Sequence, residues 1–182
     1  MEQLKVDFNK VIKSLKLSEK SINYRKENFN QFVENGFPNK RVEDWKFSDL
    51  NQIISSNIEN LRFHTDFEIS EIDETTFIDK FAHNKIIFLN GVISKVDFSF
   101  EDDTKVLITR DLNQNENSKE VNSLVSLNNA LITSYIRVTV KENYSMNEPL
   151  IIYNITTKEL KSTAINLKTD IVLEKNSSLK LI

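Results

Sequence analysis

The chain has 182 residues, a formal net charge of −3, no cysteine, and 39% hydrophobic residues that include twelve phenylalanines. This length and apolar content suit one modest domain or two small ones with a buried core, and they argue against disorder. The sequence contains no concentrated basic stripe for nucleic acid, no apolar run near the ~20 residues of a membrane helix, and no secretory signal at its start.

Two helices are predicted in the first 35 residues, because apolar side chains recur there at helical spacing. The two apolar stripes consist of Phe8, Val11, Ile12 and Leu15, and of Ile22, Phe29, Phe32 and Val33. Ser18 is expected to cap the second helix, with Glu19 in its first turn. Gly36 can adopt a left-handed conformation that ends this helix, and Pro38 prevents its resumption.

Residues 36–50 contain the only tryptophan of the chain, Trp45, among charged side chains. An indole has one large apolar body to bury and one N–H to satisfy. We therefore expect Trp45 to be a buried anchor of the joint between helices and sheet, and not a residue that stacks on a ligand.

A short helix is predicted after this stretch, because Asp49 with Gln52 resembles a capping box. Its buried side is expected to consist of Leu50, Ile53 and Ile54. Residues 57–84 have no clear period, and we expect a loop followed by a short helix near 74–82. Asp73 and Glu74 would begin that helix, where its dipole favours negative charge.

Strands dominate the prediction after residue 84. Residues 86–93 run into Asn90-Gly91, a strong hairpin signal because both residues tolerate positive φ. A strand at 106–109 is followed by a polar loop and a helix that carries Val121, Leu124, Val125 and Leu131. From Ser134 onward, alternating apolar residues predict strands in quick succession. These residues are Ile136, Val138, Val140, Leu150 to Ile155, Ile165, Leu167, Ile171, Leu173, Leu179 and Leu181.

Strands at this spacing are typical of a sandwich, a barrel or the rungs of a β-solenoid. No fixed-length repeat is evident, so periodicity alone does not choose among them. The sequence divides into a mainly helical region, 1–84, and a β-rich region, 85–182, whose regular strands begin near 134.

Several motifs resemble the SufD family of the SUF iron–sulfur cluster assembly machinery. The first motif is Phe37-Pro38-x-x-Arg41-x-Glu43-Asp44-Trp45-Lys46-Phe47-x-x-Leu50, which is similar to the family's amino-terminal signature. Three more follow in the family's order and spacing: Leu127-Asn128-x-Ala130, Ile136-Arg137-Val138 and Glu148-Pro149-Leu150. Two turns depart from the pattern, at Thr133-Ser134 and near Glu142-Asn143, although asparagine tolerates the left-handed conformation that a turn requires.

The resemblance implies an α+β, mainly β fold. It would have an amino-terminal helical region, followed by the first rungs of a right-handed β-helix that is truncated at its carboxy-terminal end. It further implies a non-catalytic, cytoplasmic scaffold subunit that acts with a SufB-like paralogue and a SufC-like ATPase. The family's contacts with both partners lie in later parts of the protein, so no functional residue is carried over to this chain. Residues 179–182 would leave an uncapped edge that is open to self-association.

Two other functions remain open on sequence grounds. One is a β-solenoid or β-sandwich module that binds a protein or a sugar and is unrelated to cluster assembly. The other is a β-helix enzyme that acts on polysaccharides, which requires a placed pair of carboxylates.

Few residues have the chemistry of a site. His64 and His83 are far apart in sequence and have no neighbours at ligand spacing. Glu101, Asp102 and Asp103 could hold a hard cation, although a solvated turn at the end of a strand suits them better. There is no glycine-rich phosphate loop and no nucleophile elbow. We therefore expect no enzymatic activity, no catalytic, cofactor-binding or metal residue, and no cofactor bound to this segment.

Overall fold

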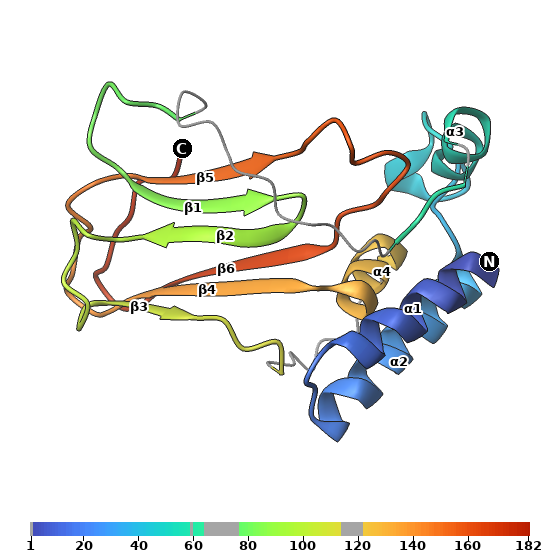
Figure 1. Cartoon of the computed structure of the whole chain (residues 1–182), viewed down its shortest axis with the longest axis horizontal. Helices are drawn as coiled ribbons and strands as arrows, with labels where there is room; N and C mark the ends of the chain where they lie inside the picture. The colour runs from blue at the N-terminus through green and yellow to red at the C-terminus, as the bar shows by residue number, and fades with distance from the viewer. Residues whose placement is uncertain (1, 59, 64–76, 114–121) are drawn as a thin grey trace. The chain divides into compact units, whose positions relative to one another are not determined.

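The computed structural model describes residues 2–58, 60–63, 77–113 and 122–182 (Figure 1). It divides into two compact units that interleave along the chain. Unit 1 comprises Met1–Thr65, Leu112–Thr133 and Leu160–Leu167, and unit 2 comprises Asp66–Asp111, Ser134–Glu159 and Lys168–Ile182. Each unit contains residues from both sides of the predicted boundary between 84 and 85. The predictions for His64, Asp73, Glu74 and Val121 lie outside the described residues.

Unit 1 is helical, as predicted. Its elements are α1 (Glu2–Ser14), α2 (Glu19–Asn35), the 3₁₀ turn η1 (Glu43–Trp45), α3 (Leu50–Asn57) and α4 (Ser123–Leu131). Ser18 caps α2 as expected, because its side chain accepts a hydrogen bond from the backbone N–H of Ser21. Figure 1 shows α1 and α2 side by side, and α4 packs on α2.

The core of unit 1 joins α1, α2 and α4 with one residue from the segment after α3. It consists of Leu4, Phe8, Val11, Phe29, Phe32, Phe63, Leu127, Ala130 and Leu131. The rings of Phe8 and Phe29 stack with their centroids 4.2 Å apart. Burial of each large apolar side chain contributes about 1.5–3 kcal/mol. This cluster therefore holds the predicted helical stripes together.

Gly36 ends α2, with its N–H donating to the Phe32 carbonyl at 2.7 Å. Its φ of 67° is positive as expected, but its ψ of −168° lies outside the left-handed helical region. This backbone region is open essentially only to glycine. The end of α2 therefore depends on a residue without a Cβ atom at this position.

Helix α3 forms where it was predicted, and the Asp49 side chain accepts from the Gln52 backbone N–H at 2.9 Å. The prediction of its buried side is wrong, because α3 has no buried residue and Ile53 is exposed. A capping residue begins a helix from local hydrogen bonds alone, whereas burial requires a packed neighbour.

The short helix predicted near 74–82 is absent from residues 77–82. Phe77 packs edge-on against Tyr153, with ring centroids 5.1 Å apart. The Ile78 N–H donates to the Tyr153 hydroxyl at 3.2 Å. These contacts hold the segment against a strand, so tertiary packing overrides the local helical tendency.

The strands form two three-stranded sheets. The elements are β1 (Asn84–Leu89), β2 (Val92–Asp97), β3 (Val106–Thr109), β4 (Ser134–Val140), β5 (Leu150–Ile155) and β6 (Leu167–Leu173). One sheet has the order β2-β1-β5 and the other β3-β4-β6. Strand β1 is antiparallel to β2 and parallel to β5. The predicted hairpin is confirmed, because Asn90 and Gly91 have φ angles of 50° and 83°.

An offset of 33 residues relates the segment 137–145 to the segment 170–178. Arg137 pairs with Asp170 and Lys141 pairs with Glu174, both at 2.9 Å. Ser145 forms a parallel bridge with Ser178. The sequence carries this offset weakly, since Val140-Lys-Glu-Asn-Tyr-Ser corresponds to Leu173-Glu-Lys-Asn-Ser-Ser. This single correspondence appears in the contacts between the two segments and was not evident from periodicity.

The end of the chain differs from the prediction. Residues 179–181 form no strand, and their segment contributes only isolated bridges, such as Leu150 with Leu181. Ile165 precedes β6 instead of belonging to it. The fold is α+β with amino-terminal helices and mixed sheets. The described residues do not form a closed solenoid or barrel, so the predicted β-helix stays a prediction.

Candidate functional site

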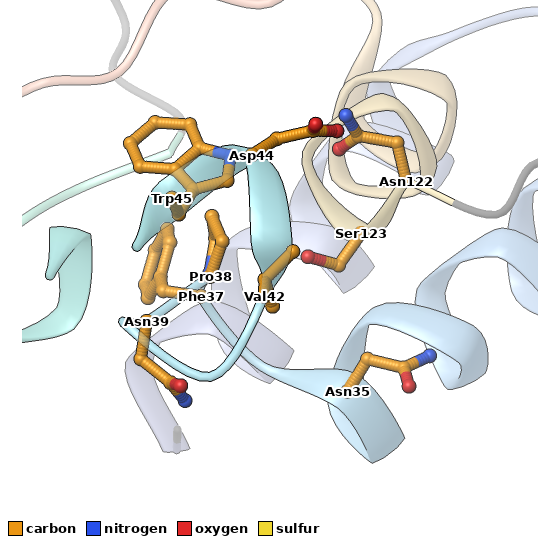
Figure 2. A pocket seen from close by; sticks show the side chains of 9 residues that line it. All are labelled: Asn35, Phe37, Pro38, Asn39, Val42, Asp44, Trp45, Asn122 and Ser123. Atoms are coloured by element: carbon orange, nitrogen blue, oxygen red, sulfur yellow. The ribbon is translucent and has the colours of Figure 1, made fainter. Parts of the chain in front are cut away.

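A pocket of about 310 Å³ opens beside η1 in unit 1 (Figure 2). Its lining comes from the end of α2, the turn that follows it, and the start of α4. The lining residues are Asn35, Phe37, Pro38, Asn39, Val42, Asp44, Trp45, Asn122 and Ser123. Most of them lie within the stretch 36–50 that the sequence singled out.

Backbone hydrogen bonds explain why this stretch folds back on itself. After Gly36 turns the chain, Phe37 packs edge-on against Phe32 with ring centroids 5.0 Å apart. The Trp45 N–H donates to the Val42 carbonyl at 2.8 Å, which forms the 3₁₀ turn. The Leu50 N–H donates to the Pro38 carbonyl at 3.1 Å and closes the loop. The pocket is thus held by the backbone at both ends of the stretch.

Trp45 is only partly buried, so the expectation of a buried anchor is wrong in degree. No residue of η1 is buried. Figure 2 shows the indole at the pocket, on the side of Phe37 and Pro38. The indole therefore contributes accessible aromatic surface to the pocket.

Asp44 is the one charged residue in the lining. It is exposed, and among the described residues its carboxylate has no hydrogen bond or ion pair. Its neighbour Glu43 differs, because it pairs with Lys46 at 3.0 Å. Figure 2 shows the Asp44 carboxylate directed toward Asn122. The pocket therefore combines an available negative charge with an aromatic face.

The start of α4 is capped within the chain itself. The Asn122 side chain already accepts from the Leu124 N–H at 2.9 Å, so the residue caps its own helix. An oxygen acceptor in that position occupies the N–H group that an anion would use.

Apolar side chains are exposed in and beside the pocket. Phe47 follows η1 and is 88% exposed, and Val42 in the lining is 45% exposed. The Lys46 ammonium lies 5.4 Å from the centre of the Phe47 ring. This segment therefore presents apolar surface to solvent around a single carboxylate.

The predicted cation candidate at Glu101 is a satisfied structural carboxylate of unit 2. It accepts hydrogen bonds from Asn84 and Tyr144 side chains, both at 2.8 Å. It also accepts from the backbone N–H groups of Asn147 and Glu148 at 3.0–3.1 Å. Burial alone would raise the pKa of Glu101, but these donors outweigh it and hold the pKa below its usual value. Glu101 thus ties its turn to the segment before β5.

Asp102 and Asp103 do not join Glu101 in a site. The Asp102 carboxylate accepts from the backbone and the hydroxyl of Thr104, at 2.8 and 2.7 Å. This is an Asx turn, so the solvated turn favoured by the sequence is confirmed. In the part of the chain that the structure describes, no three histidine, aspartate or glutamate residues gather as metal ligands.

His83 is a buried structural histidine. Its Nδ1 lies 3.0 Å from the Phe81 carbonyl, and its Nε2 lies 3.0 Å from the Tyr153 hydroxyl. With both ring nitrogens engaged, the imidazole is not placed to bind a metal ion. Because the chain has no cysteine, its described residues do not fit the ligand set of an iron–sulfur cluster.

Two buried charged residues were missed by the sequence analysis. Asp7 accepts from the Phe63 N–H at 2.9 Å, and the Arg62 guanidinium lies 3.3 Å away. Arg25 donates to the Ile132 carbonyl at 2.7 Å, and burial lowers its pKa to about 10. Both occupy positions within the helical stripes, since Asp7 lies three residues after Leu4 and four before Val11. A charged residue at a position within an apolar stripe was the sequence signal that could have predicted this burial.

Comparison with models of protein families identifies a match for this chain. The family model described as the SufBD protein N-terminal region matches residues 3–95, slightly more than half of the chain. No curated protein matches the chain. None of the helices in the described ranges is long and apolar enough to cross a membrane.

Proposed function

The chain belongs to the SufBD protein family of iron–sulfur cluster assembly, and from this premise we propose that it is a SufD-like, non-catalytic scaffold subunit. In this proposal it acts in the cytoplasm with a SufB-like paralogue and a SufC-like ATPase. The match over residues 3–95 is the observation that carries the proposal, and it includes the tryptophan signature.

The scaffold role is supported by the ligand chemistry of the chain. Iron–sulfur clusters are commonly held by cysteine thiolates, and this sequence has none. The cluster is cargo of the assembly machinery. Its ligands would therefore come from a partner subunit, while this chain provides surface on which the complex is built.

The proposal includes a right-handed β-helix that begins near residue 134. Its support is the offset of 33 residues between successive parallel contacts. The side chains of Asn176 and Ser178 bond to those of Asn143 and Ser145, at 3.0 and 2.9 Å. Asn143 and Asn176 both have positive φ, 59° and 58°, so a similar turn recurs at the same offset. Stacked rungs produce such a ladder because each repeat contacts its neighbours.

The closing residues support an edge that pairs with a further strand. Leu181 and Ile182 are 52% and 53% exposed, next to the bridge between Leu150 and Leu181. Exposed backbone groups and apolar side chains at a strand edge favour pairing with another chain. In the proposal this surface is a site of self-association, since the family's contacts with the paralogue lie in later strands.

Co-purification tests the proposal. A tagged copy of the protein, recovered gently from its native cells, is expected to bring with it an ATPase and a cysteine-containing paralogue. Leu181→Lys should reduce self-association of the chain, because a charge opposes burial at the edge, and it should leave recovery of both partners intact. Val6→Lys, a matched change at an exposed position of α1, should change neither self-association nor recovery. Failure to recover either partner from cells that express both would contradict the proposal.

Anaerobic reconstitution tests the scaffold role separately. The purified chain mixed with iron, sulfide and reductant is expected to hold no stoichiometric cluster, and mixed with ATP it should release no phosphate. A stoichiometric cluster on this chain alone would show that ligands other than thiolates build a site here.

A further inference from the structure

The pocket beside η1 offers the groups that recognise a planar cation. It has the accessible indole of Trp45, the Asp44 carboxylate, and no lysine or arginine in its lining. A cation over an aromatic face is attracted by the negative charge of that face, and a carboxylate beside the ring adds a charged acceptor. Both groups belong to η1 and both line the pocket, the indole on the side of Phe37 and Pro38 and the carboxylate directed toward Asn122 (Figure 2).

The nearest cation of the turn does not fill the pocket. Lys46 pairs with Glu43 and lies over Phe47, outside the lining. Asn122 caps α4 with its own side chain, which occupies the Leu124 N–H. The charge balance of the pocket is therefore that of one uncompensated carboxylate.

We propose that this pocket binds an arginine side chain of a partner protein. A guanidinium is flat enough to stack on the indole while its N–H fork faces a carboxylate, which the round ammonium of lysine does less well. The cleft of about 310 Å³ has room for one such side chain. Asp44 provides the charge and Trp45 the stacking surface.

The exposed apolar residues indicate that the arginine belongs to a protein segment. Val42 lines the pocket and Phe47 follows η1, and both are exposed. Free arginine would leave these side chains in water, whereas apolar neighbours of an arginine in a partner segment would cover them. The inference rests on the pocket alone and holds whether or not the chain is a SUF scaffold.

The single tryptophan makes the test direct, because its indole N–H gives one resonance in a ¹H–¹⁵N spectrum. The full chain is titrated with the peptide acetyl-Leu-Arg-Leu-amide and with matched lysine and glutamate peptides. We expect a saturable shift with the arginine peptide, several-fold weaker binding of the lysine peptide, and none of the glutamate peptide. No saturable shift, or equal shifts with all three peptides, would overturn the proposal. So would an indole resonance that moves with protein concentration alone, because the occupant would then be a second copy of this chain.

Two matched variants locate the binding. Asp44→Asn keeps the shape of the side chain and removes its charge. It is expected to lower the affinity for the arginine peptide about fivefold to tenfold. Glu43→Gln makes the same charge change one residue away, outside the lining, and should leave the affinity within twofold. Thermal unfolding of both variants confirms that they are folded. Equal losses in the two variants would mean that general charge attraction, and not this pocket, binds the peptide.

Discussion

Replacing Glu101 by glutamine should destabilise unit 2, because each oxygen of the carboxylate faces only donors. Glutamine turns one acceptor into an NH₂ group, which then faces Tyr144 and Asn147. The Tyr144 hydroxyl oxygen already accepts from the Asp102 N–H at 3.3 Å and from the Asn147 side chain at 3.2 Å. It therefore has no free acceptor site for the new amide.

The size of the effect follows from the bonds that are lost. Hydrogen bonds to a charged group contribute about 1.5–3 kcal/mol. Glutamine keeps one oxygen in place and loses the charge, so we expect a loss of about 2 kcal/mol in the free energy of unfolding. For a chain of this length that corresponds to a fall of about 4–8 °C in Tm.

The loss should depend on pH with a definite sign. The donors around Glu101 hold its pKa in the folded protein below the ordinary value of 4.5. Its stabilisation is therefore complete above pH 4.5 and disappears as the pH falls through the folded pKa. The difference between the wild-type protein and Glu101→Gln should be largest at neutral pH and shrink in acid.

Urea unfolding at a series of pH values measures this difference. Asp103→Asn is the matched control, since Asp103 is an exposed carboxylate in the same turn, and its change should lie within about 0.5 kcal/mol. A Glu101→Gln protein as stable as the wild type at neutral pH would refute the reasoning. A loss that is the same at every pH would assign the effect to shape instead of charge.

Three further predictions concern unit 1, each measured as a change in the free energy of unfolding. Trp45→Ala should cost about 1–2 kcal/mol, because the indole is partly exposed. Phe32→Ala in the core should cost about 3–5 kcal/mol. Equal costs for the two variants would mean that the indole is a buried anchor. Gly36→Ala should cost about 1–3 kcal/mol from the strain of its positive φ alone, because no neighbouring atom lies within 4 Å of the added Cβ. An unchanged stability would show that the backbone is not strained at this position. Asp7→Ala should cost about 2–3 kcal/mol, because it leaves the buried Phe63 N–H without an acceptor. Burial would raise the pKa of Asp7, but its hydrogen bonds outweigh this effect and lower the pKa. The cost of Asp7→Ala should therefore diminish as the pH falls. A cost that persists at low pH would contradict a hydrogen bond to the charged carboxylate.

Local patterns predicted most elements of this protein correctly. The stripes of the first helices, the Ser18 and Asp49 caps, the Asn90-Gly91 hairpin and the strand at 150–155 all depend on residues within a few positions of one another. Such features are set by backbone geometry and short-range hydrogen bonds, which a single stretch of sequence contains.

The burial of side chains and their hydrogen-bond partners could not be predicted from local patterns. Ile53 has the spacing of a buried residue but faces solvent, and Trp45 keeps part of its surface exposed where a buried anchor was expected. Asp7 and Arg25, which sequence would place at the surface, are buried because Phe63 and Ile132 supply partners from more than fifty residues away. Glu101 likewise has the side chain of a cation ligand. It becomes a structural acceptor only because the segment before β5 brings three donors to it and Asn84 of β1 brings a fourth.

The same distinction between local and tertiary information applies to the candidate site. Its stretch, residues 36–50, was evident from the glycine, proline and tryptophan that the sequence uses so sparingly. The pocket itself was not, because Asn122 and Ser123 of α4 reach it from a distant part of the chain. Periodicity and capping chemistry act over one or two turns and can be read along the chain. A cavity, a buried ion pair or the offset of 33 residues between strands arises only when distant segments pack, and their free energies depend on neighbours that no local stretch contains.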